Sequence, residues 1–231
     1  MRQSPDPGTL VNWLLASLIA ITFHEAAHGW VAWKRGDPTA YQQGRVTFNP
    51  LKHIDPFGTV ILPAVMILSG MPFTFGWARP VPVFFDRLKS PRWDGVLVAL
   101  AGPGINLVLA LAAAALLSLL QKLGILSGAC GAFLVSFLTI NLVLAVFNLL
   151  PVPPLDGYRV VSGFLPLRLS KKLARIEGYG LGVVLLGLFV TPWLLGLMGV
   201  RFDPMAVLLR EPVLWLMERF TDWFGIDWVS L

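Results

Sequence analysis

The sequence predicts an all-α, polytopic membrane protein with about four transmembrane helices. Hydrophobic residues make up 56% of the 231 residues and charged residues only 13%, and the mean hydropathy is +0.72. These values do not fit a water-soluble domain. The long apolar stretches also lack the alternation of apolar and polar residues that a transmembrane β-barrel requires. We therefore expect membrane-spanning helices joined by segments rich in Gly and Pro.

Four apolar stretches are long enough to cross a hydrocarbon core of about 30 Å at 1.5 Å per residue. They cover residues 9–33, 94–120, 131–150 and 178–200, and Pro192 interrupts the last one. The first stretch is too long for the apolar core of a signal peptide and contains ionisable residues. We therefore expect it to remain in the mature protein.

A fifth apolar stretch, residues 57–71, is too short for a simple crossing. It has about fifteen residues where a span needs about 20, contains Pro63 and is followed by Pro72. We expect a re-entrant or interfacial segment, which leaves the loops at 34–93 and 151–176 on one side of the membrane. These loops hold thirteen of the eighteen Lys and Arg residues. That side should be cytoplasmic in the inner or plasma membrane, with the amino terminus outside.

Two smaller segments differ in composition from the apolar spans. Residues 44–48 have strand-like composition and predict a short β-hairpin-like segment. Residues 201–231 place charged side chains near one helical face and apolar ones largely opposite, with three tryptophans among them. This pattern favours a C-terminal interfacial amphipathic helix, although a helix packed in an oligomer would look the same. We expect one membrane-embedded domain over residues 1–200, with its core at 10–163.

The net charge of +5 does not indicate nucleic-acid binding. The basic residues lie in loops between apolar spans, where the orientation of membrane helices explains them. The single cysteine, Cys130, excludes an intramolecular disulfide and a cysteine-rich metal site. Its Gly- and Ala-rich surroundings favour a small packing residue.

The first apolar stretch carries the clearest chemical motif. Residues 24–28 are His-Glu-Ala-Ala-His, an H-E-x-x-H pattern whose histidines lie four apart on a helix and can bind one zinc ion. Glu25 lies beside both ligands and can act as a general base. The alternative is a set of buried polar residues that pack a helix bundle. Ionisable side chains at membrane depth cost about 2.5–3.5 kcal/mol each, however, and usually mark function.

A catalytic zinc ion takes three protein ligands, so a third ligand is needed. The candidates are His53, the only other histidine, and Asp156, the only carboxylate close after the third span. We favour Asp156 because three prolines in residues 151–154 keep the backbone before it extended, which is tolerated at membrane depth where it lines a polar cavity. Gly157 allows a sharp turn beside it. The alternative role for Asp156 is an N-cap of the following helix.

Two separated motifs resemble the site-2 protease family of intramembrane zinc metalloproteases: H-E-x-x-H at 24–28 and N-x-x-P-x-P-x-L-D-G at 148–157. The resemblance covers about residues 10–163 and is to small bacterial members, since the chain has no room for a PDZ domain or a regulatory nucleotide-binding module. It implies roles for five residues: the zinc ligands His24, His28 and Asp156, the catalytic acid/base Glu25, and Asn148 as a contact to the substrate backbone or the oxyanion.

Two further residues are candidates for substrate contact. Residues 101–106 resemble a Gly-Pro element that opens the family's central core helix, and residues 49–56 resemble a segment of small bacterial members. Asn106 either contacts substrate or hydrogen-bonds between helices, and we favour the second because membrane-embedded Asn commonly joins helices. His53 either faces the cavity and contacts substrate or caps a turn beside Asp55.

The predicted function is that of an intramembrane zinc metalloendopeptidase with one zinc ion. It would cleave transmembrane protein or peptide substrates in the lipid bilayer, with its site towards the cytoplasmic side. The first alternative is a transporter or ion channel with buried His, Glu and Asp along its path, which the lack of two matching hydrophobic halves weakens. The second is an inactive relative that binds membrane proteins, which the presence of the complete ligand set and Glu25 weakens. The sequence does not predict an oligomeric state.

Overall fold

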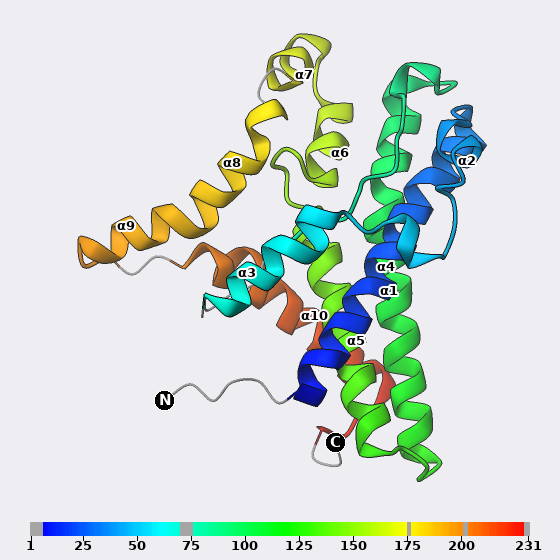
Figure 1. The fold of residues 1–231 in the computed structure, drawn as a ribbon, viewed down its shortest axis with the longest axis vertical. Coiled ribbons are helices and arrows are strands. Elements are labelled where there is room, and N and C mark those ends of the chain that lie inside the picture. Colours follow the sequence, from blue (N-terminus) through cyan, green and yellow to red (C-terminus); the bar gives the residue numbers. More distant parts are fainter. Residues whose placement is uncertain (1–6, 70–75, 175–176, 201–202, 229–231) are drawn as a thin grey trace.

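The computed structural model describes residues 7–69, 76–174, 177–200 and 203–228. These residues are helical with connecting loops, and none of them lies in a strand (Figure 1). The α-helices are α1 (Pro7–Arg35), α2 (Thr39–Gln42), α3 (Leu62–Leu68), α4 (Pro91–Lys122), α5 (Gly128–Asn148), α6 (Asp156–Phe164), α7 (Leu167–Ala174), α8 (Gly180–Leu185), α9 (Thr191–Leu197) and α10 (Glu211–Phe224). Short 3-10 helices are η1 (Pro50–Lys52), η3 (Phe85–Arg87) and η4 (Glu177–Tyr179), and π-helical turns are η2 (Pro56–Ile61), η5 (Leu186–Val190) and η6 (Ala206–Arg210).

Helices α1, α4 and α5 form the bundle on which the rest of the chain is arranged (Figure 1). Each is long and apolar enough to cross a membrane, which confirms three of the predicted spans. Helix α4 packs against both α1 and α5. Its contact with α5 is made by Ala110, Ala114 and Leu117 against Leu138 and Leu142, all fully buried. Small residues let two helices approach closely. In lipid, where no hydrophobic effect drives helices together, this van der Waals packing stabilises the bundle.

The fourth predicted span, residues 178–200, forms an apolar helical run that is shorter than the other three. It consists of α8, the π-helical turn η5 and α9, and it extends away from the bundle (Figure 1). Pro192 explains the π turn, because proline lacks a backbone N–H and its ring crowds the carbonyl four residues earlier. Met205 returns to pack beside Val184 and Leu188. The described residues therefore contain three helices of crossing length and not four.

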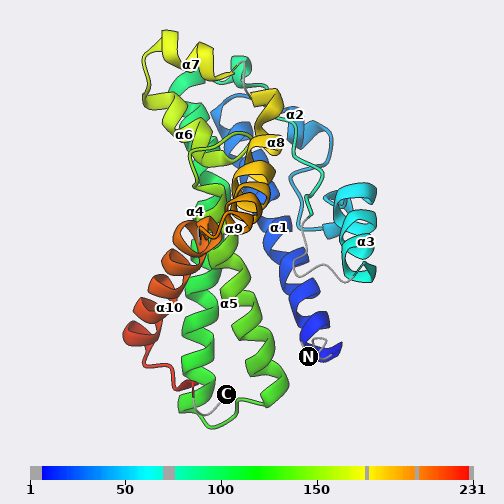
Figure 2. The ribbon, with the colours of Figure 1, turned by 90° about the vertical axis from the view of Figure 1, so that its left-hand side faces the viewer.

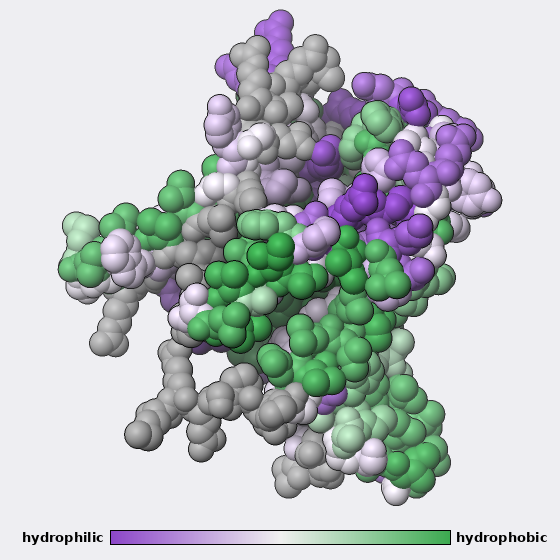
Figure 3. All heavy atoms as spheres, in the orientation of Figure 1, coloured by the Kyte–Doolittle hydropathy of each residue, from purple (hydrophilic) through white to green (hydrophobic). Residues whose placement is uncertain are grey.

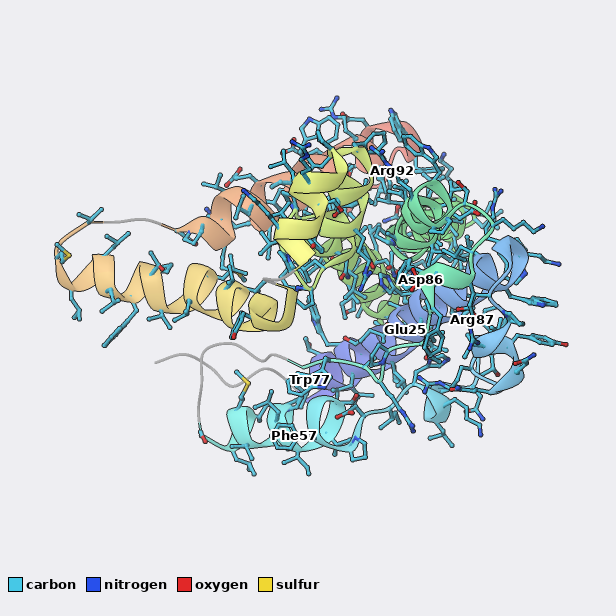
Figure 4. All side chains as sticks on the ribbon, turned by 90° about the horizontal axis from the view of Figure 1, so that it is seen from above. Glu25, Phe57, Trp77, Asp86, Arg87 and Arg92 are labelled. Carbon is cyan, nitrogen blue, oxygen red and sulfur yellow. The ribbon has the colours of Figure 1, made fainter. Side chains whose placement is uncertain are left out.

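The segment at 57–71 leaves the bundle and returns to the same place. It forms the short helical run of η2 and α3, which ends at Leu68. The chain comes back at Trp77, whose backbone N–H donates to Gly58 O at 3.2 Å and whose carbonyl accepts from Thr59 Oγ1 at 2.8 Å. Figure 4 shows Phe57 and Trp77 side by side at the base of α3. The segment therefore does not traverse the bundle from one end to the other, as the re-entrant or interfacial interpretation requires.

The predicted β-hairpin-like segment at residues 44–48 is a turn followed by bends. Gly44 has a left-handed φ of 63°, which closes a turn and interrupts an extended strand. The Arg45 side chain is buried, and its Nη2 donates to Arg79 O at 2.7 Å. Side-chain bonding therefore replaces strand pairing here, and the strand prediction is wrong for these residues.

The C-terminal helix α10 is amphipathic but packs on the bundle. Val213 and Phe220 are buried in one cluster with Leu117 and Leu138 of α4 and α5. Near its end, the Ser118 hydroxyl of α4 donates to Phe224 O at 2.6 Å. Figure 2 shows α10 running beside α4 and α5. This differs from a helix that lies apart on the membrane surface, and the interfacial position stays a prediction.

The surface divides into two regions (Figure 3). Hydrophilic residues gather over α2 and the loops between α1 and α4, whereas hydrophobic residues cover α3 and the lower part of the bundle. Two of the long helices, α1 and α4, expose large apolar side chains such as Leu14, Val108 and Leu119, as a lipid-facing surface requires. The chain is thus built for a bilayer, with one polar end.

Candidate metal centre and active site

A cavity of about 370 Å³ lies between α1, α4, α6 and the extended segment before η3. It is lined by His24, Glu25, His28, Pro80, Val81, Val83, Phe85, Val98, Ala99, Asn148, Pro154, Asp156 and Arg159. Five of the seven predicted site residues are among them, and they come from three separate parts of the chain. Figure 4 shows Glu25 on α1, facing the interior of the bundle.

The two histidines and the aspartate meet at one point. His24 Nε2 and His28 Nε2, one helical turn apart on α1, are 3.0 Å from each other. Asp156 Oδ2 lies 3.2 Å from His24 Nε2 and 3.4 Å from His28 Nε2. The predicted third ligand is therefore brought to the first two, although about 130 residues of sequence separate them.

Asp156 is positioned by close packing before and after it. It is the first residue of α6, whose N-cap is Leu155, so the alternative N-cap role does not hold. At Gly157 a Cβ atom would lie 2.1 Å from Leu149 O, so only glycine lets α6 begin this close to the end of α5. At the other end of α6, Gly163 packs against Val96 of α4 with no room for a side chain.

Hydrogen bonds on the far side of each histidine ring orient it. His28 Nδ1 lies 2.7 Å from Val98 O, a backbone carbonyl that can only accept. His28 Nδ1 must therefore carry the proton, which leaves Nε2 with a lone pair. His24 Nδ1 lies 2.6 Å from Asn106 Oδ1 in the same kind of contact. Both Nε2 atoms then point their lone pairs at one another and at a carboxylate.

This donor set fits a zinc ion. A tetrahedral zinc ion with bonds of about 2.0–2.1 Å keeps its ligand atoms about 3.3–3.4 Å apart, close to the spacings of the three atoms here. Asp156 Oδ2 is buried, and no group among the described residues donates a hydrogen bond to it. Two lone pairs and a carboxylate oxygen at this spacing repel one another unless a cation lies between them. His24, His28 and Asp156 are therefore the residues that would hold the metal.

Glu25 is held beside this centre without belonging to it. Its Oε2 accepts a hydrogen bond from the backbone N–H of Val81 at 2.8 Å. Val81 belongs to the extended segment that lines the cavity. Arg45 Nη2 donates a hydrogen bond to Arg79 O of the same segment. One carboxylate oxygen is thus anchored to the backbone while the side chain lines the cavity, as a general base requires.

The predicted substrate contacts have different positions. Asn148 lines the cavity at the end of α5, and one of its two amide hydrogens goes to Leu144 O at 3.0 Å, which leaves the second for a ligand. Asn106 is fully buried behind His24, and His53 is 2% exposed with Nε2 on Thr47 O. Neither lines the cavity, so the substrate-contact alternative does not agree with the structure for either residue. The hydrogen bonds of Asn106 to α1 and α5 agree with the helix-joining role that was favoured for it.

Two residues of the site were not predicted. Arg159 lines the cavity one turn after Asp156, with its guanidinium 4.4 Å from the centre of the Phe85 ring. The spacing of three on a helix is a signal that could have found it. Gly102 of α4 packs directly against both histidine rings. Its role follows from the approach of α4 to α1, which the sequence alone does not give.

Comparisons with known proteins show the family to which the chain belongs. The sequence model of peptidase family M50 matches residues 124–190. The chain is 45% identical over 192 residues to the Bacillus subtilis protein named "Putative zinc metalloprotease YwhC", covering 80% of this chain and 84% of that protein. The chain belongs to peptidase family M50, the site-2 protease family.

More distant members of the family extend the comparison. The Mycobacterium tuberculosis protein named "Putative zinc metalloprotease Rip2" is 34% identical over 201 residues, which cover 85% of this chain and 74% of that protein. A Methanocaldococcus jannaschii protein, named "Putative zinc metalloprotease MJ0611", is 34% identical over 152 residues, covering 64% and 70%. No solved structure matches the chain at a significant level. M50 peptidases use zinc, which confirms the predicted cofactor.

Proposed function

We propose that this M50 protein is an intramembrane endopeptidase that hydrolyses peptide bonds within or near transmembrane segments of other membrane proteins. The observation that carries the proposal is the convergence of Asp156 on His24 and His28 beside Glu25, on a helix (α1) apolar enough to cross a membrane. Zinc bound there would supply Lewis acidity, which activates water and polarises a peptide carbonyl.

The protein's own residues would transfer the proton, stabilise the developing negative charge and limit the access of water. Glu25, anchored by Val81 N–H, accepts a proton from the attacking water and later delivers it to the leaving amine. Asn148 lies at the same cavity and offers an amide hydrogen to the carbonyl oxygen as negative charge develops on it. The apolar walls, including Val83 and Val98, limit the access of other water molecules.

The depth of the site sets the kind of substrate. His24 lies about ten residues before the basic end of α1 at Lys34, which puts it about 15 Å below that end. A peptide bond that reaches this depth belongs to a transmembrane segment or its flank. Because the backbone of a spanning helix is already hydrogen-bonded, the substrate must unwind locally, which Gly or Pro in the substrate eases.

A transport function agrees less well with the geometry. Buried His and acidic side chains of a translocation path are spread along the membrane normal so that an ion can pass from one to the next. Here the side chains of His24, His28 and Asp156 meet at one position, and the distances between their Nε2 and Oδ2 atoms are 3.0–3.4 Å. That arrangement suits a bound ion that stays in place.

The position of the cut tests the proposal. Purified protein in liposomes is incubated with two substrates that carry the same candidate cleavage sequence, one inside a transmembrane segment and one in a water-soluble host. We expect mass spectrometry to find cleavage within or next to the transmembrane segment of the first, and intact second substrate. Cleavage of the soluble substrate alone, or no zinc-dependent cleavage of any of a panel of transmembrane segments, would overturn the proposal.

A further inference from the structure

A buried chain of hydrogen bonds runs behind the candidate metal centre, away from the cavity. It begins at His24 on α1, passes through Asn106 on α4 and ends at Asn141 on α5. Both asparagines are fully buried. Asn106 was predicted either to contact substrate or to hydrogen-bond between helices, and nothing in the proposed reaction uses Asn141.

Asn141, the last residue of this series, fixes which atom is the donor in each hydrogen bond of the series. Asn141 Nδ2 donates to Phe137 O at 2.8 Å, and a backbone carbonyl can only accept. Asn141 Oδ1 must therefore face Asn106, where it accepts from Asn106 Nδ2 at 2.9 Å. A flip of the Asn141 amide would place two donors together at one end and two acceptors together at the other.

The same logic fixes the amide of Asn106. Its Nδ2 has two hydrogens, and besides Asn141 Oδ1 it faces Ala20 O at 3.4 Å, another group that can only accept. The Oδ1 atom of Asn106 is thereby turned towards His24 Nδ1 at 2.6 Å. An acceptor at this position requires a proton on His24 Nδ1, and a neutral imidazole then has its lone pair on Nε2.

We infer that Asn106 and Asn141 are positioning residues that set the tautomer and ring orientation of His24, and so present its Nε2 lone pair to the metal. His28 needs no such device, because its Nδ1 faces the backbone carbonyl of Val98. A hydrogen bond to the second nitrogen of a ligating histidine fixes its tautomer and raises its basicity, and its loss typically costs about 10–100-fold in metal affinity. This inference rests on the zinc ligands of the proposed function.

The competing explanation is that the asparagines only hold three helices together. The two explanations predict different zinc affinities for the Asn106→Asp variant. In Asn106→Asp the carboxylate still accepts from His24 Nδ1 but cannot donate to Asn141 Oδ1 or Ala20 O. The variant therefore keeps the contact to the histidine and loses the other two contacts between helices. Asn106→Leu loses both kinds of contact and keeps the number and branching of the side-chain heavy atoms.

The test measures zinc affinity per folded molecule, by competition with a chelator, in monodisperse detergent-solubilised protein. We expect Asn106→Leu to bind zinc about 10–100-fold more weakly than the wild type, and Asn141→Leu to shift in the same direction by a smaller factor. We expect Asn106→Asp to stay within a few-fold of the wild type, although its thermal stability falls. Ser136→Ala removes another buried polar group of α5, whose hydroxyl bonds only to Ala132 O, and should leave zinc affinity unchanged.

The visible spectrum of the cobalt-substituted protein gives a second readout that does not depend on cleavage. The spectrum of Asn106→Asp should match that of the wild type, and the spectrum of Asn141→Leu should change if the chain reaches the metal. Equal zinc affinity in the wild type, Asn106→Leu and Asn141→Leu would overturn the inference while leaving the proposed protease intact. So would an Asn106→Asp variant that binds zinc as weakly as Asn106→Leu. A wild-type protein that binds no zinc would instead overturn the proposed function.

Discussion

Replacing Gly102 by alanine should destroy the metal centre with one methyl group. A Cβ atom on Gly102 would lie 2.4 Å from His28 Nε2 and 2.6 Å from His24 Nε2. A comfortable contact needs about 3.4 Å or more, so one or both ligand atoms must move by about 1 Å, or α4 must move away from α1. Both rings are tied at Nδ1, to Val98 O and to Asn106 Oδ1, and so cannot swing aside without breaking those bonds.

The size of this displacement predicts the size of the effect. A zinc site tolerates ligand distances within about 0.2 Å of the ideal value, and the expected displacement is about five times larger. We therefore expect zinc affinity to fall by at least about 100-fold and cleavage to fall with it. The added methyl also overpacks the interface between α1 and α4, at a cost of about 1–3 kcal/mol, which leaves room for a folded variant.

Gly104 provides a matched control two residues further along α4. A Cβ atom there meets nothing within 4 Å, so Gly104→Ala should keep zinc and activity and stabilise the helix by about 0.5–1 kcal/mol. Zinc is measured by chelator competition, folding by size exclusion and circular dichroism, and activity with a transmembrane substrate. Wild-type zinc affinity in a folded Gly102→Ala variant would refute the packing described here.

Three further predictions concern single side chains. Asp156→Ala should lose zinc, because only two neutral histidine ligands remain, whereas His53→Ala should retain it; metal analysis of both purified variants checks this, and the reverse result would reassign the third ligand. Asn148→Ala should keep zinc yet cleave about 10²–10³-fold more slowly, measured as single turnover, and an unchanged rate would exclude its role at the oxyanion. Burial opposes the charge of Asp37, but hydrogen bonds from Thr39 and from Phe84 N–H outweigh it and lower the pKa of that carboxyl. Asp37→Asn should therefore cost about 1–3 kcal/mol at neutral pH, and the difference in unfolding midpoint should vanish as pH falls through the lowered pKa; a constant difference would contradict this.

Local patterns in the sequence were enough to select the candidate site residues that the structure brings together. The spacing of four between His24 and His28 requires one face of a helix, and the prolines before Asp156 exclude an ordinary helical continuation. The structure places these groups together as predicted. The short length of residues 57–71 and Pro63 also predicted that this segment would not cross, and the contact between Gly58 and Trp77 agrees.

Features that depend on the approach of distant segments were not predictable from local patterns. The chain of bonds from His24 to Asn141 and the contact of Gly102 with the rings both depend on how closely α4 packs against its neighbours. The hydropathy of residues 178–200 fits a span, but the helical run is shorter than the three long helices and contains a π-helical turn before Pro192. Strand-like composition at 44–48 was overridden by the buried side chain of Arg45.

The most direct test of the central claim is single-turnover cleavage of one transmembrane substrate by zinc-loaded Glu25→Gln. Glu25 lies at the cavity and is held by Val81 N–H, but it is not one of the three metal-binding residues. The variant should therefore contain as much zinc as the wild type, while cleavage falls by about 10²–10⁴-fold, because an amide cannot accept the proton of the attacking water. Undiminished cleavage by zinc-loaded Glu25→Gln would contradict the account.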